Sequence, residues 1–282
     1  MNSHKQQLLE LIRLNTSTLP EDVAARLRQA ASDATGSAAT VLRALVDNAA
    51  LSGGRSTPMC QDTGWLSFFF KVPPGCDTLA LRRDTESAVA EATALGYLRR
   101  NTIDSLSGAS CDDNTVAGVV PVCHFEADSA ATAITVSILQ KGGGSENMSR
   151  QFSLPDVEIG AGRDLEGVRK CLLHAVHGAQ GYGCAPGVIG VCIGGDRAEG
   201  MLVAKEQLLR SLDDEAEDPR LAELERTVLR EANELGIGPM GLGGSPTLLG
   251  VKIAARPRLP ASFFVSVAYC CWACRRHTVE LS

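Results

Sequence analysis

The chain has 282 residues, of which 44% are hydrophobic, and its 27 basic and 33 acidic side chains give a formal net charge of -6. That length and apolar content support a sizeable core in one large α/β domain. An acidic chain without a Lys/Arg block argues against a nucleic-acid-binding surface, and no stretch reaches the roughly 18 to 20 apolar residues of a membrane span.

The N-terminus and the cysteines indicate a cytoplasmic protein. Residues 1–7 are polar and lack the apolar segment of a secretory signal. The chain has 10 cysteines, which lie between Cys60 and Cys274. In a cytoplasmic chain, such a number indicates buried thiols together with a metal-binding or catalytic set, and not a disulfide framework.

The hydrophobic periodicity predicts a mixed α/β fold with a helical N-terminal section at residues 1–55. The remainder, residues 56–282, alternates β-rich and helical patterns, although the order of the strands is not readable. In chain order we expect a strand at 65–72, a helix at 84–99, strands at 117–125 and 133–139, a helix at 164–179, a strand at 188–193, helices at 198–212 and 221–235, and strands at 248–253 and 262–268.

A polar loop, Cys60-Gln61-Asp62-Thr63-Gly64, comes directly before the first expected strand. A thiol followed by an amide, a carboxylate and a hydroxyl suits a thiolate ligand beside a polar substrate pocket. A buried cysteine near a turn, with Asp62 and Thr63 capping it, explains the same residues equally well.

A glycine-rich run, Lys141-Gly142-Gly143-Gly144-Ser145-Glu146-Asn147, follows the strand expected at 133–139. Three consecutive glycines leave backbone N–H groups unobstructed, and such a nest of N–H groups binds an anion such as a carboxylate. Lys141 adds a positive charge. A flexible hairpin loop is the alternative interpretation of the same run.

Two further cysteine-bearing loops complete the candidate set. Cys184 lies in a Gly-Cys-Ala-Pro-Gly turn, and Cys271 lies in Cys270-Cys271-Trp272-Ala273-Cys274-Arg275-Arg276. Cys271 and Cys274 form a C-x-x-C, but the second pair that zinc requires is missing, and packing as small hydrophobes is the alternative. The arginines can bind a carboxylate bidentately. Three thiolates could hold a [4Fe-4S] cluster with one iron open as a Lewis acid, although spacing alone does not establish this.

Five segments, taken in order, resemble class I fumarases and L(+)-tartrate dehydratases, which are iron–sulfur hydro-lyases. They are Cys60–Gly64, Asp113-Asn114-Thr115, Lys141–Asn147, 235–244 and Cys271-Trp272-Ala273 followed by arginines. The resemblance covers nearly the whole chain. The glycine-rich run looks more like fumarases, whereas the last segment looks more like the tartrate enzymes.

The resemblance implies a [4Fe-4S] cluster whose ligands are Cys60, Cys184 and Cys271. It also implies that the substrate is contacted by Gln61, Asp62, Arg99 and Gly143. The chemistry of the loops adds Lys141, Gly142 and Arg275 to the substrate-binding set. Asp62 is the expected catalytic carboxylate.

The implied activity is the reversible hydration of a small dicarboxylate, first of all fumarate to malate. L(+)-tartrate dehydration and mesaconate hydration are the alternatives among enzymes. An iron–sulfur carrier or redox sensor that uses Cys271 and Cys274 is the alternative from another class. Such a sensor would have no need for Lys141, the three glycines or the Gln61-Asp62 pair.

Two features of the sequence depart from the family pattern. Leu259 stands where the family usually has a histidine, so one proton-transfer group is left open. Single-chain members carry a further C-terminal domain, whereas this chain stops at Ser282. We therefore expect an α subunit that acts with a separate β subunit in a higher oligomer.

Overall fold

The computed structural model describes residues 4–282, in which the chain forms two compact units. Unit 1 contains the chain up to Pro20, Asp47–Gly142 and Arg275–Ser282, whereas unit 2 contains Glu21–Val46 and Gly143–Cys274. Compactness does not show which segments fold independently. The single domain expected from the sequence, with sections 1–55 and 56–282, therefore stays a prediction.

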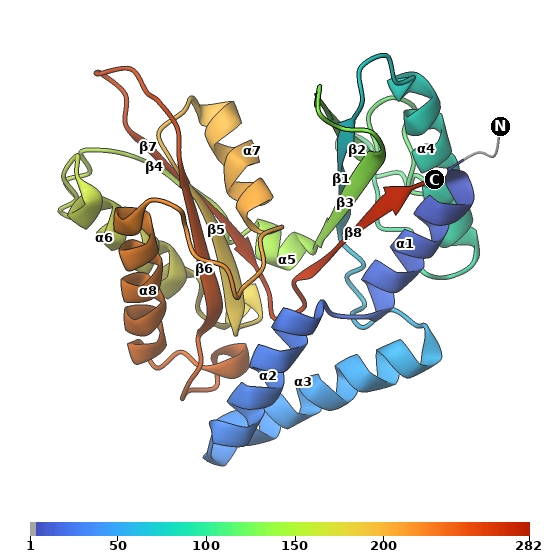
Figure 1. Cartoon of the computed structure of the whole chain (residues 1–282). Coiled ribbons are helices and arrows are strands. Elements are labelled where there is room, and N and C mark those ends of the chain that lie inside the picture. Colours follow the sequence, from blue (N-terminus) through green and yellow to red (C-terminus); the bar gives the residue numbers. More distant parts are fainter. Residues whose placement is uncertain (1–3) are drawn as a thin grey trace. The chain divides into compact units, whose positions relative to one another are not determined.

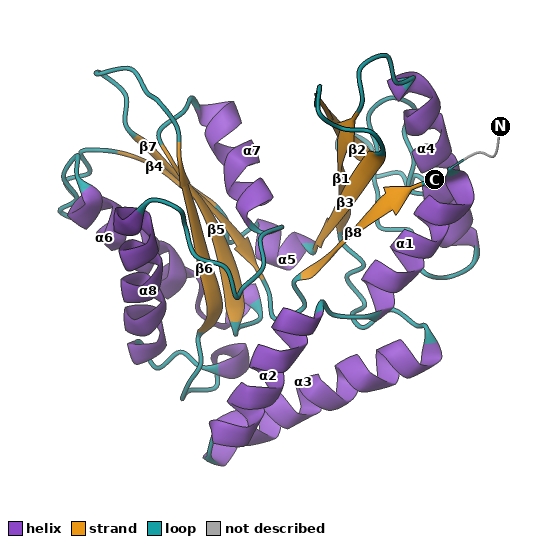
Figure 2. Cartoon of the chain, in the orientation of Figure 1, coloured by secondary structure: helices purple, strands orange, loops and turns teal. Residues whose placement is uncertain are grey.

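Unit 1 is built on a four-stranded sheet with the strand order β2-β1-β3-β8 (Figures 1 and 2). Its strands are β1 (Trp65–Val72), β2 (Val122–Ala127), β3 (Ile134–Lys141) and β8 (Arg275–Leu281). β1 is parallel to β2 and antiparallel to β3, and β3 is antiparallel to β8. The helices α1 (Lys5–Ser17) and α4 (Thr78–Ala94) pack against each other, and apolar side chains of both join the sheet in one core.

The strand register of unit 1 explains why residues far apart in the chain converge. Trp65, at the start of β1, lies opposite Lys141, at the end of β3. Gln140 in turn lies opposite Arg275, at the start of β8. Antiparallel pairing therefore gathers the loop before β1, the residues after β3 and the first residue of β8 at one end of the sheet.

Unit 2 is a second four-stranded sheet, with the order β4-β7-β5-β6. Its strands are β4 (Arg150–Ser153), β5 (Gly187–Ile193), β6 (Leu248–Ala255) and β7 (Phe264–Cys270). Figure 1 shows α6 (Leu165–Ala179) and α8 (Pro219–Glu234) on one face of this sheet and α7 (Arg197–Gln207) on the other. All seven residues of β5 are buried, as expected for a strand that is covered on both faces.

The remaining helices are α2 (Glu21–Asp33), α3 (Gly36–Arg55), the short α5 (Gly143–Glu146) and the 3-10 turns η1 (Gln180–Gly183) and η2 (Pro239–Gly241). The predicted α/β class with a helical N-terminal section is confirmed. The helix expected at 84–99 has the wrong bounds, because α4 begins at Thr78 after the N-cap Asp77, which accepts from Ala80 N, and Gly96 takes a positive φ just beyond its end. None of the helices within residues 4–282 combines the length and the apolar character that crossing a membrane requires.

Candidate functional site

The loop from Cys60 to Gly64 is held through three consecutive backbone carbonyls, each of which accepts a hydrogen bond from a different segment of unit 1. The contacts are Arg99 Nη1 to Gln61 O at 3.2 Å, Arg275 Nη2 to Asp62 O at 3.1 Å, and Gln140 Nε2 to Thr63 O. Two guanidinium groups therefore donate to the backbone carbonyls of two neighbouring residues, Gln61 and Asp62. The structure thus brings Gln61, Asp62, Arg99 and Arg275 together at one loop, and their predicted role in substrate binding stays a prediction.

The Asp62 side chain folds back on its own loop and lies against the glycine-rich run. Its Oδ1 accepts from Gly64 N at 3.0 Å, and its backbone N–H donates to Cys60 Sγ at 3.4 Å. A Cβ atom on Gly142 would lie 2.9 Å from Asp62 Oδ2. Gly142 is thus required because the carboxylate occupies the space of a side chain. Lys141, just before it, is buried at the end of β3.

Gly64 offers a test of how tightly this loop is packed. We expect Gly64→Ala to lower the free energy of unfolding by about 2–5 kcal/mol, because φ is +78° there and a Cβ would lie 2.8 Å from the Lys141 backbone. Gly75→Ala is the matched control, since φ is +81° but nothing lies within 4 Å. It should cost only the conformational part, roughly 1–2 kcal/mol. Urea denaturation of both variants measures the difference, and equal losses would show that the contact is unimportant.

Arg275 is the most deeply buried cation of this region. Its side chain is 1% exposed, and its Nε and Nη1 atoms have no hydrogen-bond partner among residues 4–282. Unmet donors on a buried charged group are costly, so native proteins rarely leave them. An anion that accepts from both nitrogens would remove that cost, and a carboxylate has the matching geometry.

A buried network of hydrogen bonds, which was not predicted from the sequence, holds the Cys60–Gly64 loop through Gln140. Gln140 Oε1 accepts from Asn15 Nδ2 and from Thr16 Oγ1, both at 3.1 Å. Asn15 Oδ1 in turn lies 2.9 Å from His277 Nδ1. The signal was available in the sequence: Gln140 shares its face of an alternating strand pattern with Val136 and Ile138, and a polar residue at such an inward position needs a partner.

Two of the three predicted ligand cysteines come together in unit 2. Trp272 N donates to Cys184 O at 3.1 Å, which joins the loop of Cys184 to the loop of Cys271. The Tyr269 ring lies so close to Gly183 and Gly187 that a Cβ on either would be within 2.5 Å of it. Burial, reinforced by the neighbouring Cys271, Cys270 and Cys184, raises the pKa of Tyr269. The neutral Tyr269 ring therefore packs against the glycines on either side of Cys184 and fixes the shape of that turn.

Three of the other thiols are less suited to metal binding than the predicted ligands. Cys184 is exposed, and Cys60 and Cys271 are partly exposed. By contrast, burial raises the pKa of Cys171 to about 12, and the pKa values of Cys123 and Cys192 to about 11. Because the thiolate is the form that binds metals, the raised values make those three poor ligands.

The donor chemistry of Cys60, Cys184 and Cys271 fits an iron–sulfur cluster, which takes thiolates. Within residues 4–282, no three His, Cys, Asp or Glu side chains are grouped closely enough to hold a metal ion. Cys60 lies in unit 1 with Gln61, Asp62, Lys141 and Gly142, whereas Cys184, Cys271 and Gly143 belong to unit 2. Leu259, in the segment between β6 and β7, is 74% exposed.

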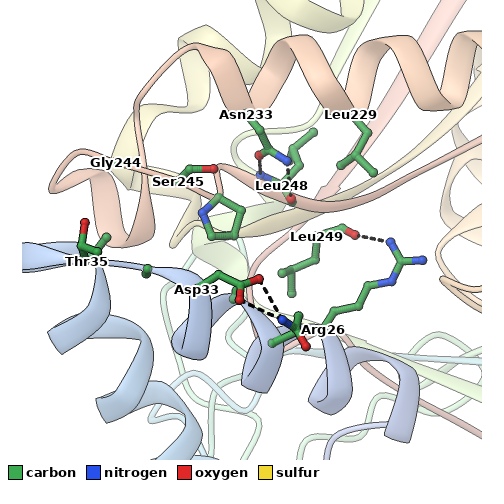
Figure 3. Close-up of a pocket in the computed structure, with 14 residues that line it drawn as sticks. Arg26, Asp33, Thr35, Leu229, Asn233, Gly244, Ser245, Leu248 and Leu249 are labelled. Carbon is green, nitrogen blue, oxygen red and sulfur yellow. Dashed lines mark hydrogen bonds between the residues drawn. The ribbon is translucent and has the colours of Figure 1, made fainter.

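A cavity of about 570 Å³ in unit 2 contains none of the predicted site residues (Figure 3). It is lined by α2, α8 and the segment before β6. Its charged and amide side chains already bond to the chain itself: Arg26 donates to Leu249 O at 2.9 Å, Asn233 bonds to the backbone of Leu248, and Asp33 accepts from Gln29. The cavity therefore does not present the convergent open polar groups of a catalytic pocket.

A loop that carries a thiol, a carboxylate and contacts from two arginines has the chemistry to receive an anionic substrate beside a metal-binding thiolate. Comparison with known proteins agrees with this class. The family model described as fumarate hydratase (Fumerase) matches residues 5–280. The chain belongs to this fumarate hydratase family.

Individual relatives carry two kinds of name. A Geobacillus stearothermophilus protein named "Putative fumarate hydratase class I" is 45% identical over 281 residues, which cover 98% of this chain and 54% of the relative. A Methanocaldococcus jannaschii protein named "Putative L(+)-tartrate dehydratase subunit alpha" is 32% identical, with coverage of 95% and 94%. The L(+)-tartrate dehydratase subunit alpha of Escherichia coli K12 is 29% identical, with coverage of 98% and 93%. The chain thus spans about half the length of the first relative.

Proposed function

We propose that this chain is the α subunit of a cluster-dependent hydro-lyase that interconverts fumarate and malate. The observation that carries the proposal is the pair of guanidinium contacts on the loop of Cys60 and Asp62, with two buried N–H donors of Arg275 still open. A dicarboxylate carries two negative charges and needs cationic donors when it leaves water. Family membership supports the reaction class.

The proposed ligands of the [4Fe-4S] cluster are Cys60, Cys184 and Cys271. When bound, the cluster supplies a Lewis-acidic iron that polarises the substrate hydroxyl. Arg275 and Arg99 are proposed to hold a substrate carboxylate, because their N–H groups match it in geometry and charge. The remaining proposed substrate contacts come from Gln61, Lys141, Gly142 and Gly143.

Asp62 is proposed to handle a proton in the reaction. Its carboxylate is fixed by Gly64 N and lies against Gly142. A positioned carboxylate of this kind can exchange a proton with a substrate or with a water molecule. The exposed Leu259 has no titratable group and takes no part.

A β subunit is proposed as the partner that completes the active enzyme. Two of the relatives are named as alpha subunits, and this chain covers more than nine tenths of each. The cations found near Asp62 suffice for one carboxylate of the substrate, so the second end needs further donors. L(+)-tartrate is the second candidate substrate, which those same names favour. A cytoplasmic location and a higher oligomer stay predictions.

The partner requirement is tested by assaying the anaerobically reconstituted chain with and without a co-expressed β-type protein. We expect fumarate hydration only with both proteins, because general acid–base help and distal charge are each worth about 10²-fold or more. L-tartrate dehydration is measured in parallel and should be slower. Substantial hydration by the chain alone would disprove the partner requirement, and turnover of tartrate but not fumarate would reverse the substrate assignment.

A further inference from the structure

We infer that Asn114 is a positioning residue that sets the conformation of Arg99 at the substrate site. The inference rests on the proposed function for the part that concerns substrate. Asn114 lies in a long irregular segment between α4 and β2, more than ten residues from Arg99 in the chain. It is nevertheless 3% exposed, whereas Arg99 is exposed.

The Asn114 side chain makes four hydrogen bonds, which is its full capacity. Its Oδ1 accepts from Asn101 N at 2.9 Å and from Thr102 N at 3.0 Å. Its Nδ2 donates to Thr93 Oγ1 at 3.0 Å and to Arg99 O at 2.7 Å. A single buried amide thus joins the end of α4 to the backbone on both sides of Arg100.

The backbone N–H of Arg99 is held by the Cys60–Gly64 loop. Thr63 Oγ1 accepts from Arg99 N and from Asn101 Nδ2, both at 3.1 Å, and Thr63 is 1% exposed. The Arg99 N–H is therefore fixed by Thr63, its carbonyl by Asn114, and its guanidinium by Gln61 O at 3.2 Å. Ordering a binding residue costs both backbone and side-chain entropy, and fixing the Arg99 backbone beforehand removes the backbone part of that cost.

The backbone at Asn114 explains why an asparagine suits this position. Its φ is +62°, a conformation that asparagine and aspartate tolerate better than other side chains. Aspartate would keep both acceptor contacts but could not donate to Arg99 O. It would instead set a carboxylate oxygen against that carbonyl. Asn114→Asp is therefore an isosteric change that removes the link to Arg99 and keeps the turn.

The kinetic test compares Asn114→Asp, Thr63→Val and Arg99→Ala in the reconstituted complex with its β subunit. Arg99→Ala should raise the KM for fumarate about 10- to 100-fold, as expected for loss of a charge-assisted contact. Asn114→Asp and Thr63→Val should each raise KM about 10-fold and change kcat less than about 3-fold. In the Arg99→Ala background, Asn114→Asp should have no further effect on KM, because it acts through Arg99.

Thr93→Val is the structural control, because it removes the contact between Asn114 and α4 but leaves the contact with Arg99 O. It should lower thermal stability and leave KM within about 2-fold. A rise in KM as large as that of Asn114→Asp would show that any loosening of the segment suffices, which would overturn the inference. An unchanged KM in Arg99→Ala would instead overturn the proposed role of Arg99 in binding substrate.

Nuclear magnetic resonance relaxation of the Arg99 Nε–H group tests the positioning without any assay of activity. The order parameter of this group should fall in Asn114→Asp and in Thr63→Val and stay unchanged in Thr93→Val. An order parameter that is the same in all four proteins, including the unsubstituted one, would refute the inference even if the proposed reaction were correct.

Discussion

Replacing Cys60, Cys184 or Cys271 with serine is expected to abolish the broad iron–sulfur absorbance of the anaerobically reconstituted chain. Each substitution removes one of three thiolates, and a hydroxyl is a much poorer ligand for iron in such clusters. The three positions are on loops and at least partly exposed, so the substitutions create no core cavity. The iron–sulfur absorbance and the iron content per chain measure the effect, and both should be lost.

The controls are cysteines that the structure assigns to other roles. Cys171 is fully buried in the core of unit 2, and Cys171→Ala should lower stability but leave the cluster absorbance unchanged. Cys76→Ser changes a partly exposed thiol before α4 and should be silent in both measurements. A full cluster in Cys184→Ser would show that the ligand set is wrong, whereas a lost cluster in Cys76→Ser would show that thiols are not distinguished by their loops.

Much of the fold could be predicted because the apolar pattern is strong where strands are buried. The strand expected at 65–72 is β1, residue for residue, and β5 extends the strand expected at 188–193 by one residue. β8 was missed because Arg275 and Arg276 open it, and charged residues read as a loop until their burial is known. β4 was missed because four residues are too few for a period of two to be visible.

The residues of the candidate site could be predicted from the sequence, but the contacts that hold them in place could not. The thiol and the carboxylate of the Cys60–Gly64 loop are local features, so a sequence reader sees them together. The contacts that hold this loop come from Gln140 and Arg275, which only the strand register brings alongside it. Asn114 lies in a segment that matched the family, yet its four hydrogen bonds depend on the fold of an irregular segment. Such contacts have no periodicity and leave no pattern in one sequence.

Asp62→Asn is expected to lower kcat about 10²- to 10⁴-fold, which is the usual contribution of a positioned general acid or base. Asparagine has the same shape, and its side-chain oxygen can still accept from Gly64 N, as Asp62 Oδ1 does at 3.0 Å. The contact between Asp62 N and Cys60 Sγ also involves only the backbone at residue 62. Cluster absorbance and stability should therefore be retained while turnover is lost, which separates this variant from the cysteine variants.

Asp104→Asn is the matched control for that experiment. Asp104 lies in unit 1 and, like Asp62, accepts from the backbone N–H two residues ahead, at 3.2 Å from Leu106 N. The two substitutions thus remove the same charge from the same kind of turn, but only Asp62 lies beside the arginine contacts and the glycine-rich run. Asp104→Asn should keep kcat within about 2-fold, since exposed polar changes away from a site have small effects. A kcat for Asp62→Asn that is equally unaffected would remove Asp62 from the chemistry, and the proton would then have to pass through a group of the β subunit.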